Sequence, residues 1–90
     1  MTIDSPEVRL CENVVAQVMD GQMVLLDTRG GQYFDLNVSG TLMLEQLLAG
    51  ASRDQVVATL ERKFRVDARR VSADLDALLL TLREARLIEP

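Results

Sequence analysis

The sequence predicts an α+β fold, in which a small antiparallel sheet is followed by three helices. From residue 14 to residue 36, apolar and polar side chains alternate with a period of two, which is typical of strands with one buried face. From residue 40 onward, apolar residues recur with the helical period of 3.6. Strands grouped first and helices grouped second indicate an α+β fold, because α/β folds alternate the two.

Two turn signals divide the first half into three strands. Asp20-Gly21 is a dipeptide that favours the positive φ angles of a two-residue hairpin turn, and residues 27–31, DTRGG, supply a longer loop that contains glycine. We therefore expect strands at about residues 14–19, 22–28 and 32–36. Residues 1–13 are expected to be a lead-in with at most one short extra strand, ahead of a single domain at residues 14–90.

Three residues with capping side chains, Asn37, Ser52 and Asp67, mark the starts of three helices. Ser52 also begins the pattern SRDQ, which has the form of a capping box. Gly50 is expected to end the first helix, because glycine tolerates the left-handed conformation found at helix ends. The third helix is the longest and is expected from about residue 68 to residue 86.

The third helix carries two apolar stripes. At about 100° per residue, the stripe expected to face the core consists of Val71, Leu75, Leu78 and Leu82. A shallower second stripe on the far flank consists of Ala73, Ala77 and Leu80, bordered by Asp76 and Arg83. A helix that only covers a sheet does not need the second stripe, although the two charged residues would equally suit a solvated flank.

The third strand, within GGQYFDLN, also has one large side chain without an obvious position in the core. If Phe34 faces the helices, alternation turns Tyr33 outward, whereas a bulge would place Tyr33 and Leu36 on the same face. Ordinary surface exposure would explain Tyr33 and Leu80. The alternative is a groove between an edge strand and the third helix, in which an extended peptide adds as a further strand.

The composition excludes several classes of function. The 90 residues contain no histidine and one cysteine, Cys11, so a single chain cannot assemble a zinc site, a disulfide or a Cys/His catalytic pair. We therefore expect no metal, no other cofactor and no catalytic residue, and we predict a binding protein and not an enzyme. The sequence shows neither a signal peptide nor an apolar run of roughly 20 residues, so we expect a cytoplasmic protein without membrane contact.

The charge pattern keeps DNA binding open as an alternative. The net charge of −4 disfavours nucleic acid, but residues 53–70 contain six basic and three acidic residues, a local balance of +3. This segment is the junction of the second and third helices, where a winged-helix regulator would meet phosphate. Against DNA binding, the third helix is acidic and apolar beyond its first turn. The basic junction could instead dock a partner enzyme or be solvated surface.

Several short motifs occur in a set order between residues 14 and 88. They are an apolar strand, a glycine turn, YFDLN, a helix after SG, a second helix that ends in an aromatic residue before VD, and a last helix that closes on LI. This ordered set resembles the PqqD-like RiPP recognition element, and most of all the stand-alone leader-binding proteins of lasso peptide biosynthesis. The resemblance implies a winged-helix-like module that binds the leader of a ribosomally made precursor peptide.

The resemblance also implies a site and partners. In that family the leader pairs with the third strand and lies against the third helix. The implied site residues are Gln32, Tyr33, Phe34, Asp35 and Leu36 on the strand, and Ala73, Asp76, Ala77, Leu80 and Arg83 on the helix. The bound leader would be presented to a transglutaminase-like cysteine peptidase and to an ATP-dependent cyclase, whereas PqqD-type relatives act beside a radical SAM enzyme. Dimerisation through the same open strand edge is the remaining alternative.

Overall fold

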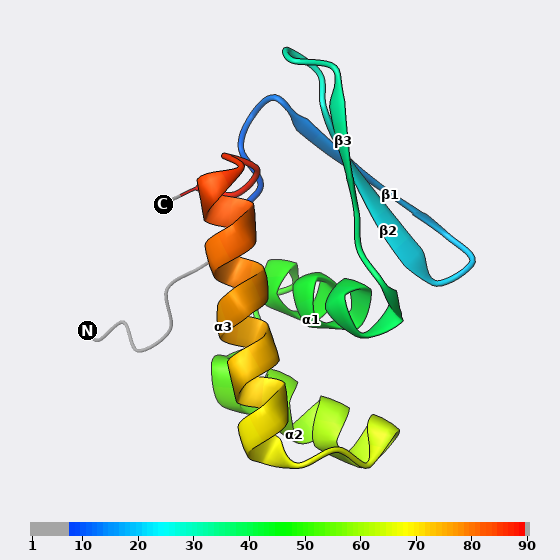
Figure 1. The fold of residues 1–90 in the computed structure, drawn as a ribbon, viewed down its shortest axis with the longest axis vertical. Coiled ribbons are helices and arrows are strands. Elements are labelled where there is room, and N and C mark those ends of the chain that lie inside the picture. Colours follow the sequence, from blue (N-terminus) through cyan, green and yellow to red (C-terminus); the bar gives the residue numbers. More distant parts are fainter. Residues whose placement is uncertain (1–7, 90) are drawn as a thin grey trace.

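The computed structural model describes residues 8–89, in which three strands precede three helices (Figure 1). The strands are β1 (Val14–Met19), β2 (Gln22–Asp27) and β3 (Gln32–Asp35). The helices are α1 (Val38–Leu48), α2 (Arg53–Phe64) and α3 (Ala68–Glu84). The predicted α+β fold is confirmed, and the element bounds agree with the predicted ones to within about two residues, the usual uncertainty of helix and strand ends.

The sheet is antiparallel with the order β1-β2-β3, so that β1 and β3 are both edges. The β1–β2 turn places Asp20 at a φ of 54° and Gly21 at 76°, the left-handed values for which an Asp-Gly turn is selected. In the β2–β3 turn, Gly31 has a φ of 71°, and its N–H donates to the carbonyl of Asp27 at 2.7 Å. Both turn predictions from the sequence are confirmed.

The register of β3 decides which of its two aromatic side chains faces the helices. Phe34 lies opposite Leu25, and Tyr33 lies opposite Leu26. Leu25 is fully buried at 0% exposure, whereas Tyr33 is 73% exposed. Directly opposed residues share a face of the sheet, so Phe34 faces the core and Tyr33 faces outward. Strict alternation therefore holds in β3, and the alternative with a bulge is wrong.

All three helices begin at the predicted caps. The Asn37 side chain accepts a hydrogen bond from the backbone N–H of Gly40 at 2.8 Å. Ser52 and Gln55 exchange both bonds of a capping box, at 3.1 and 2.8 Å. Asp67 caps α3. These side chains satisfy backbone donors that have no partner inside the helix, which is why short polar residues at these positions fix the helix starts.

The first of two hydrophobic clusters lies between the sheet, α1 and the carboxyl half of α3. Its buried members are Val14, Met23, Leu25, Leu36, Leu44, Leu82, Leu87 and Ile88. Thr41 of α1 is buried as well, and its hydroxyl accepts the backbone N–H of Met23 at 2.8 Å. Because this bond satisfies a buried donor of β2 beyond the end of β3, it ties α1 to the sheet.

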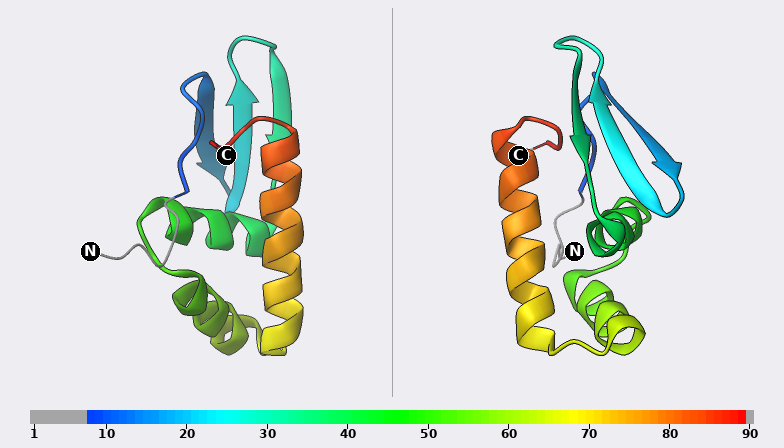
Figure 2. Two further views of the ribbon diagram at one scale, coloured as in Figure 1. Left: turned by 90° about the vertical axis from the view of Figure 1, so that its left-hand side faces the viewer. Right: turned by 45° about the vertical axis from the view of Figure 1, so that its right-hand side comes forward.

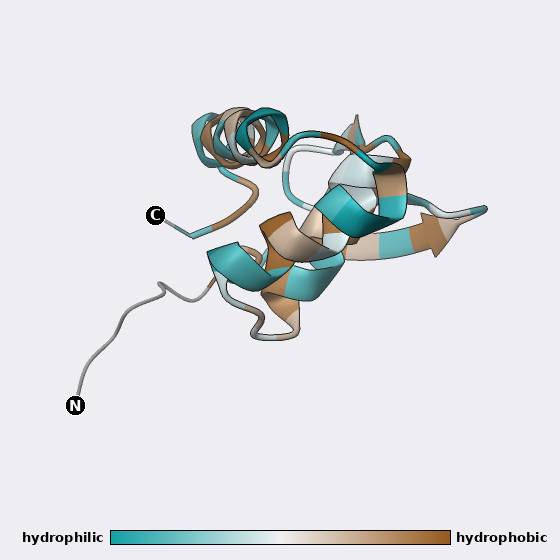
Figure 3. Cartoon of the chain, turned by 90° about the horizontal axis from the view of Figure 1, so that it is seen from below, coloured by the Kyte–Doolittle hydropathy of each residue, from teal (hydrophilic) through white to brown (hydrophobic). Residues whose placement is uncertain are grey.

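The second cluster joins α1, α2 and the amino half of α3. Its buried members are Met43, Leu47, Val56, Leu60, Val71 and Leu75. Leu78 and Leu79 pack against both clusters, so α3 spans the whole core. The buried residues of α2 and α3 lie at helical spacing, as amphipathic helices require. Figure 3, a view from below, shows that both helices carry hydrophilic as well as hydrophobic residues.

The helices all lie on one side of the sheet, and α3 stands beside β3 (Figures 1 and 2). The short extra strand expected in the lead-in is, among the described residues, an isolated bridge between Leu10 and Ile88. Residues 1–7 lie outside the described residues. Within residues 8–89, no helix is both long and apolar enough to cross a membrane.

Candidate functional site

A groove of about 400 Å³ runs between β3 and α3, and the amino end of α1 closes one end of it. We call it the β3–α3 groove. Its lining residues are Phe34, Asp35, Leu36, Asn37, Ser39, Gly40, Met43, Asp74, Ala77, Leu78 and Thr81. One long wall is therefore a strand edge, and the other is a single face of a helix.

The α3 wall follows from helical geometry. Asp74, Ala77, Leu78 and Thr81 are spaced i, i+3, i+4 and i+7, so they lie in one row along the helix. Leu78 is half-buried and anchors this row to the core, while Ala77 and Thr81 are exposed. Because alanine and threonine are small, α3 leaves room beside β3 where larger residues would fill it.

The β3 wall has backbone groups without partners in the sheet. The N–H of Leu36 donates to the carbonyl of Met23 on β2 at 2.8 Å. In an antiparallel strand, alternate residues direct their N–H and C=O to the same neighbour, so Phe34 also points its backbone toward β2. Tyr33 and Asp35 then direct theirs to the free edge. Such an edge is a template for one more strand.

Side chains and backbone of β3 thus serve different surfaces. Phe34 is half-buried and lines the groove, and Leu36 is buried at its floor. The Tyr33 side chain points to the outer face of the sheet and does not line the groove. Of the two aromatic residues predicted to shape pockets, Phe34 supplies a side chain to this groove, and Tyr33 supplies edge backbone.

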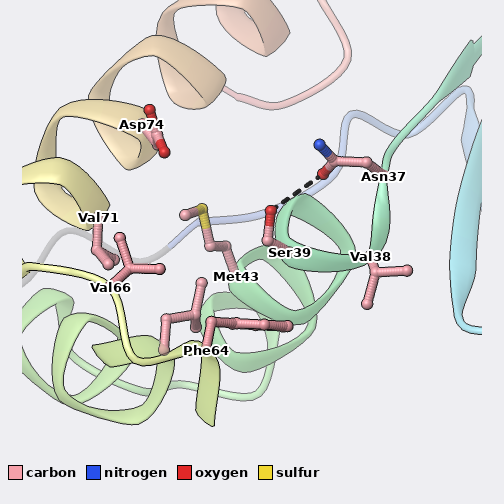
Figure 4. A pocket seen from close by; sticks show the side chains of 9 residues that line it. Asn37, Val38, Ser39, Met43, Phe64, Val66, Val71 and Asp74 are labelled. Atoms are coloured by element: carbon pink, nitrogen blue, oxygen red, sulfur yellow. Dashed lines mark hydrogen bonds between the residues drawn. The ribbon is translucent and has the colours of Figure 1, made fainter. Parts of the chain in front are cut away.

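A second hollow of about 350 Å³ adjoins the groove between α1, the end of α2 and the start of α3 (Figure 4). We call it the corner pocket. It shares Asn37, Ser39, Met43 and Asp74 with the groove. Its remaining lining residues are Val38, Leu60, Phe64, Val66 and Val71. The unshared lining is entirely apolar, so the corner pocket suits an apolar side chain at the α1 end of the groove.

The structure separates Asp76 from the groove. Its carboxylate forms an ion pair of 2.7 Å with the guanidinium of Arg53 on α2, which also donates to the Ser72 hydroxyl at 2.8 Å. Consecutive residues of a helix are about 100° apart. Because Ala77 faces β3, Asp76 is turned toward α2, where the charged pair links two helices.

Three more predicted helix residues lie outside the lining of the groove. Ala73, Leu80 and Arg83 are exposed, and Leu80 is 57% exposed. Around the axis of α3, Leu80 lies about 100° from Thr81, on the side away from the core stripe. The geometry therefore brings together Phe34, Asp35, Leu36 and Ala77 of the ten predicted residues, with the edge backbone of Tyr33. Contact of any of the ten with a peptide stays a prediction.

Sequence reasoning missed the polar part of the lining. Asp74 and Thr81 lie in the same row as Ala77, but a search for an apolar stripe passes over them. Asn37 is predicted as a helix cap only, but it lines the groove as well, together with Ser39, whose hydroxyl donates to the Asn37 side chain at 3.3 Å. Asn37 and Ser39 come directly after the strand residues YFDL, and this position in the sequence could have indicated that they line the groove.

The charges at the groove are acidic. Asp74 lines it from α3, and Asp35 borders it through the edge of β3 while its carboxylate points to the outer face of the sheet. Arg70 approaches Asp74 at 3.8 Å, but both side chains are mostly exposed, so the pair has little effect on stability. The groove therefore favours a basic or neutral ligand side chain over an acidic one.

A carboxylate at the end of β2, that of Asp27, fixes the turn that leads into β3. The side chain of Asn13 donates to Asp27 at 2.6 Å, and the backbone N–H of Arg29 donates to it at 3.0 Å. The Asn13 bond first, and then backbone bonds from Gly30 and Arg29, lower the pKa of Asp27 below its ordinary value. The ionised form of Asp27 thus holds the β2–β3 turn.

Among residues 8–89, no group of three or more histidine, cysteine, aspartate or glutamate side chains is placed to hold a metal ion. Cys11 is a free, half-buried thiol that packs against the first hydrophobic cluster. What the groove offers a ligand is therefore backbone pairing, apolar contact and charge.

Comparison with known proteins supports a peptide site. The family model of coenzyme PQQ synthesis protein D (PqqD) matches residues 22–88. A solved structure described as lasso peptide synthetase B1 complexed with the leader peptide is 33% identical, with a TM-score of 0.89 over 94% of this chain and 100% of that chain. TbiB1 in complex with the TbiA(beta) leader peptide is 28% identical, with a TM-score of 0.81 over 90% of this chain and 94% of that chain. No curated protein matches.

Proposed function

The chain belongs to the PqqD family, and we propose that it binds the leader segment of a lasso-type precursor peptide by strand addition to β3. The observation that carries this proposal is an open strand edge beside a groove with one small-residue wall. Both similar structures were solved with leader peptides. The protein acts in this proposal as a recognition element without catalytic activity of its own.

The added strand runs antiparallel to β3. Every pair in the sheet is already antiparallel, and antiparallel pairing is slightly more stable per residue than parallel pairing. In this direction the amino side of the leader reaches the corner pocket at the start of α1. The carboxyl side, which leads to the product-forming part of the precursor, leaves past the β2–β3 turn, away from α1 and α2. In this direction the part of the precursor that follows the leader stays free and accessible to the processing enzymes.

Backbone pairing alone is too weak to hold the leader. The N–H and C=O of Tyr33 and Asp35 offer four hydrogen bonds, each worth about 1 kcal/mol net. A dissociation constant between micromolar and tens of nanomolar corresponds to about −8 to −10 kcal/mol. At least about 4–6 kcal/mol must then come from side chains, or about 160–240 Å² of apolar surface at 25 cal/mol per Å². Two or three buried side chains supply that area.

Specificity therefore resides in the pockets and not in the strand pairing. Side chains on the groove side of the leader contact Phe34, Ala77 and Leu78, and one apolar residue on its amino side enters the corner pocket beside Phe64. Asp74 disfavours acidic residues on the groove side of the paired segment.

The loaded complex is the form delivered to the processing enzymes. In this proposal a cysteine peptidase removes the leader and a cyclase closes the product ring, both while the leader is held at β3. Tethering converts an encounter between enzyme and free precursor into one within a complex, which raises the local concentration of the cleavage site.

The proposal is tested by titrating the protein with a fluorescent synthetic leader of the precursor encoded beside it, using anisotropy. Tyr33→Pro removes an edge N–H and leaves a carbonyl of the leader without its partner, at a cost of about 1–3 kcal/mol, so we expect about 5- to 150-fold weaker binding. Tyr33→Ala keeps that N–H and should change binding less than threefold. Ala16→Pro is the matched control, because the register directs the Ala16 backbone to the opposite edge, that of β1.

Equal loss of affinity in Tyr33→Pro and Ala16→Pro, with both variants folded by circular dichroism, would contradict strand addition at β3. Absence of saturable binding by the wild type would contradict leader recognition as a whole. A random DNA duplex at physiological salt is included, because saturable binding of the duplex instead of the leader would favour the winged-helix alternative based on residues 53–70.

A further inference from the structure

The outer face of the sheet is unusually apolar for a surface that no helix within residues 8–89 covers. The register directs eight residues of the strands outward, namely Val15, Gln17, Met19, Gln22, Val24, Leu26, Tyr33 and Asp35. Five of these eight are apolar or aromatic and one is charged. An antiparallel sheet with one face in water normally alternates apolar residues on the inside with polar residues on the outside. We call this surface the outer sheet face.

The apolar residues of the outer sheet face form a continuous row. Val15 pairs with Leu26, and Leu26 pairs with Tyr33, so the three lie directly side by side across all three strands. Val15 is 53% exposed and Tyr33 is 73% exposed. In Figures 1 and 2 no described helix lies against this face.

The β1 end of this face also lacks the usual protection of an edge strand. The sequence of β1, VVAQVM, contains no charge and no proline, the residues that ordinarily keep edges from associating. Val18 and Met19 are exposed where the strand ends, and Figure 3 shows this end of β1 as hydrophobic. An unprotected edge next to an apolar row indicates a surface that another protein covers.

We propose that the outer sheet face is the docking surface of the leader peptidase, and that the bound leader completes it. This inference rests on the proposed strand addition at β3. The row Val15–Leu26–Tyr33 ends at the edge where the leader adds, and neighbouring strands lie about 4.8 Å apart. Outward side chains of the leader therefore extend the row from three strands to four, continuous with the leader interface.

A second copy of the chain fits this surface less well than an enzyme does. A stable interface buries about 800 Å² on each partner, so a partner must cover more than the row of Val15, Leu26 and Tyr33 alone. Adding the leader enlarges the outer sheet face only at the β3 edge, because the leader pairs with that strand. A partner that contacts both proteins can distinguish the loaded complex from the empty one, and the peptidase must reach the leader in any case. Its complementary surface has an apolar centre and a basic group opposite Asp35, the one charged outward residue.

Binding of leader and peptidase is consequently coupled, and the coupling is reciprocal. If the leader strengthens peptidase binding tenfold, the peptidase must strengthen leader binding tenfold. The protein without a leader then binds the peptidase weakly and does not compete with the loaded complex for it.

The test measures binding of the pathway's peptidase, with its nucleophilic cysteine changed to alanine, to immobilised protein with and without saturating leader. We expect at least tenfold tighter binding to the loaded protein. Val15→Gln should weaken peptidase binding to the loaded protein at least tenfold, and it should leave leader affinity within twofold, because β1 lies two strands away from the leader. Ala16→Gln is the matched control, an exposed position of the same strand on the opposite face.

Two results would overturn the inference. One is equal peptidase affinity for empty and loaded protein. The other is a dimer in sedimentation equilibrium that Val15→Gln converts to monomer, which would assign the face to a second copy. Leader titration of the wild type is read separately. Normal leader binding without peptidase preference defeats this inference alone, whereas no leader binding defeats the proposed function.

Discussion

Ala77 is the position at which a small change should close the β3–α3 groove. It lines the groove from the α3 side, it is exposed, and it stands in mid-helix, so a larger helix-forming residue can replace it without disturbing the core. In Ala77→Leu the new side chain occupies space that one leader side chain would fill. Burial of one such side chain is worth about 1.5–3 kcal/mol, so the dissociation constant for the leader should rise about 10- to 150-fold.

The matched control for this change is Ala73→Leu. Ala73 is an exposed alanine of the same helix, one turn earlier, and it does not line the groove. Both variants change helix propensity by the same small amount, so urea unfolding should show stabilities within about 0.5 kcal/mol of each other. Leader affinity is measured by anisotropy. Equal affinities in the two variants would refute the assignment of the groove, and a loss in Ala73→Leu alone would restore the flank that contains Leu80 as the binding face.

Three further predictions concern the framework of the site. Thr41→Val leaves a buried backbone N–H of β2 without an acceptor and should lower the free energy of unfolding by about 1–3 kcal/mol in urea titration. Ser52→Ala removes the capping box of α2 and should cost about 1 kcal/mol in the same assay. In an NMR titration the pKa of Asp27 should lie below its ordinary value of 3.8, and Asn13→Ala should raise it. Because the folded pKa is depressed, Asp27 contributes stability above its ordinary pKa and loses that contribution as the pH falls through the folded pKa.

Controls and contrary outcomes differ among these three. Thr81→Val changes an exposed hydroxyl of α3, and a loss of stability equal to that of Thr41→Val would contradict the role of the buried bond. A Ser52→Ala variant as stable as the wild type would mean that water replaces the cap at no cost. A pKa of Asp27 that is unchanged by Asn13→Ala would assign the shift to the backbone donors of Gly30 and Arg29.

Local features were predictable from the sequence because their physics is local. The Asp20-Gly21 turn and the Ser52 cap each depend on backbone conformations that a few neighbouring residues decide, and both occur where the sequence places them. The phase of β3 was open, since alternation fixes the spacing of the two faces but not which face is buried. Leu25, on a different strand, decides it by pairing with Phe34.

The helix side of the site was harder to predict for a tertiary reason. A helical wheel locates the core stripe of α3, and two flanks adjoin that stripe. Only the arrangement of the whole chain shows that α2 lies against the flank with Asp76, and β3 against the flank with Asp74 and Thr81. A prediction based on apolar residues also favours Leu80 over Thr81. A groove that holds a peptide backbone, however, needs small and polar residues in its walls as well as apolar ones.

The position of α3 explains why we propose one sheet edge and not the other as the peptide site. β1 and β3 both expose backbone groups, and β1 is the longer strand. Among residues 8–89, only β3 has a helix beside it (Figure 2). Strand addition without such a wall gains hydrogen bonds but little apolar burial, which is too little to order a free peptide. Leu87 and Ile88 follow the carboxyl end of α3 and are buried in the cluster that joins α3 to the sheet. Leu10 pairs with Ile88. We therefore expect Leu87 and Ile88, far in sequence from β3, to influence the width of the groove. Substitutions at Ile88 should alter leader affinity as well as stability.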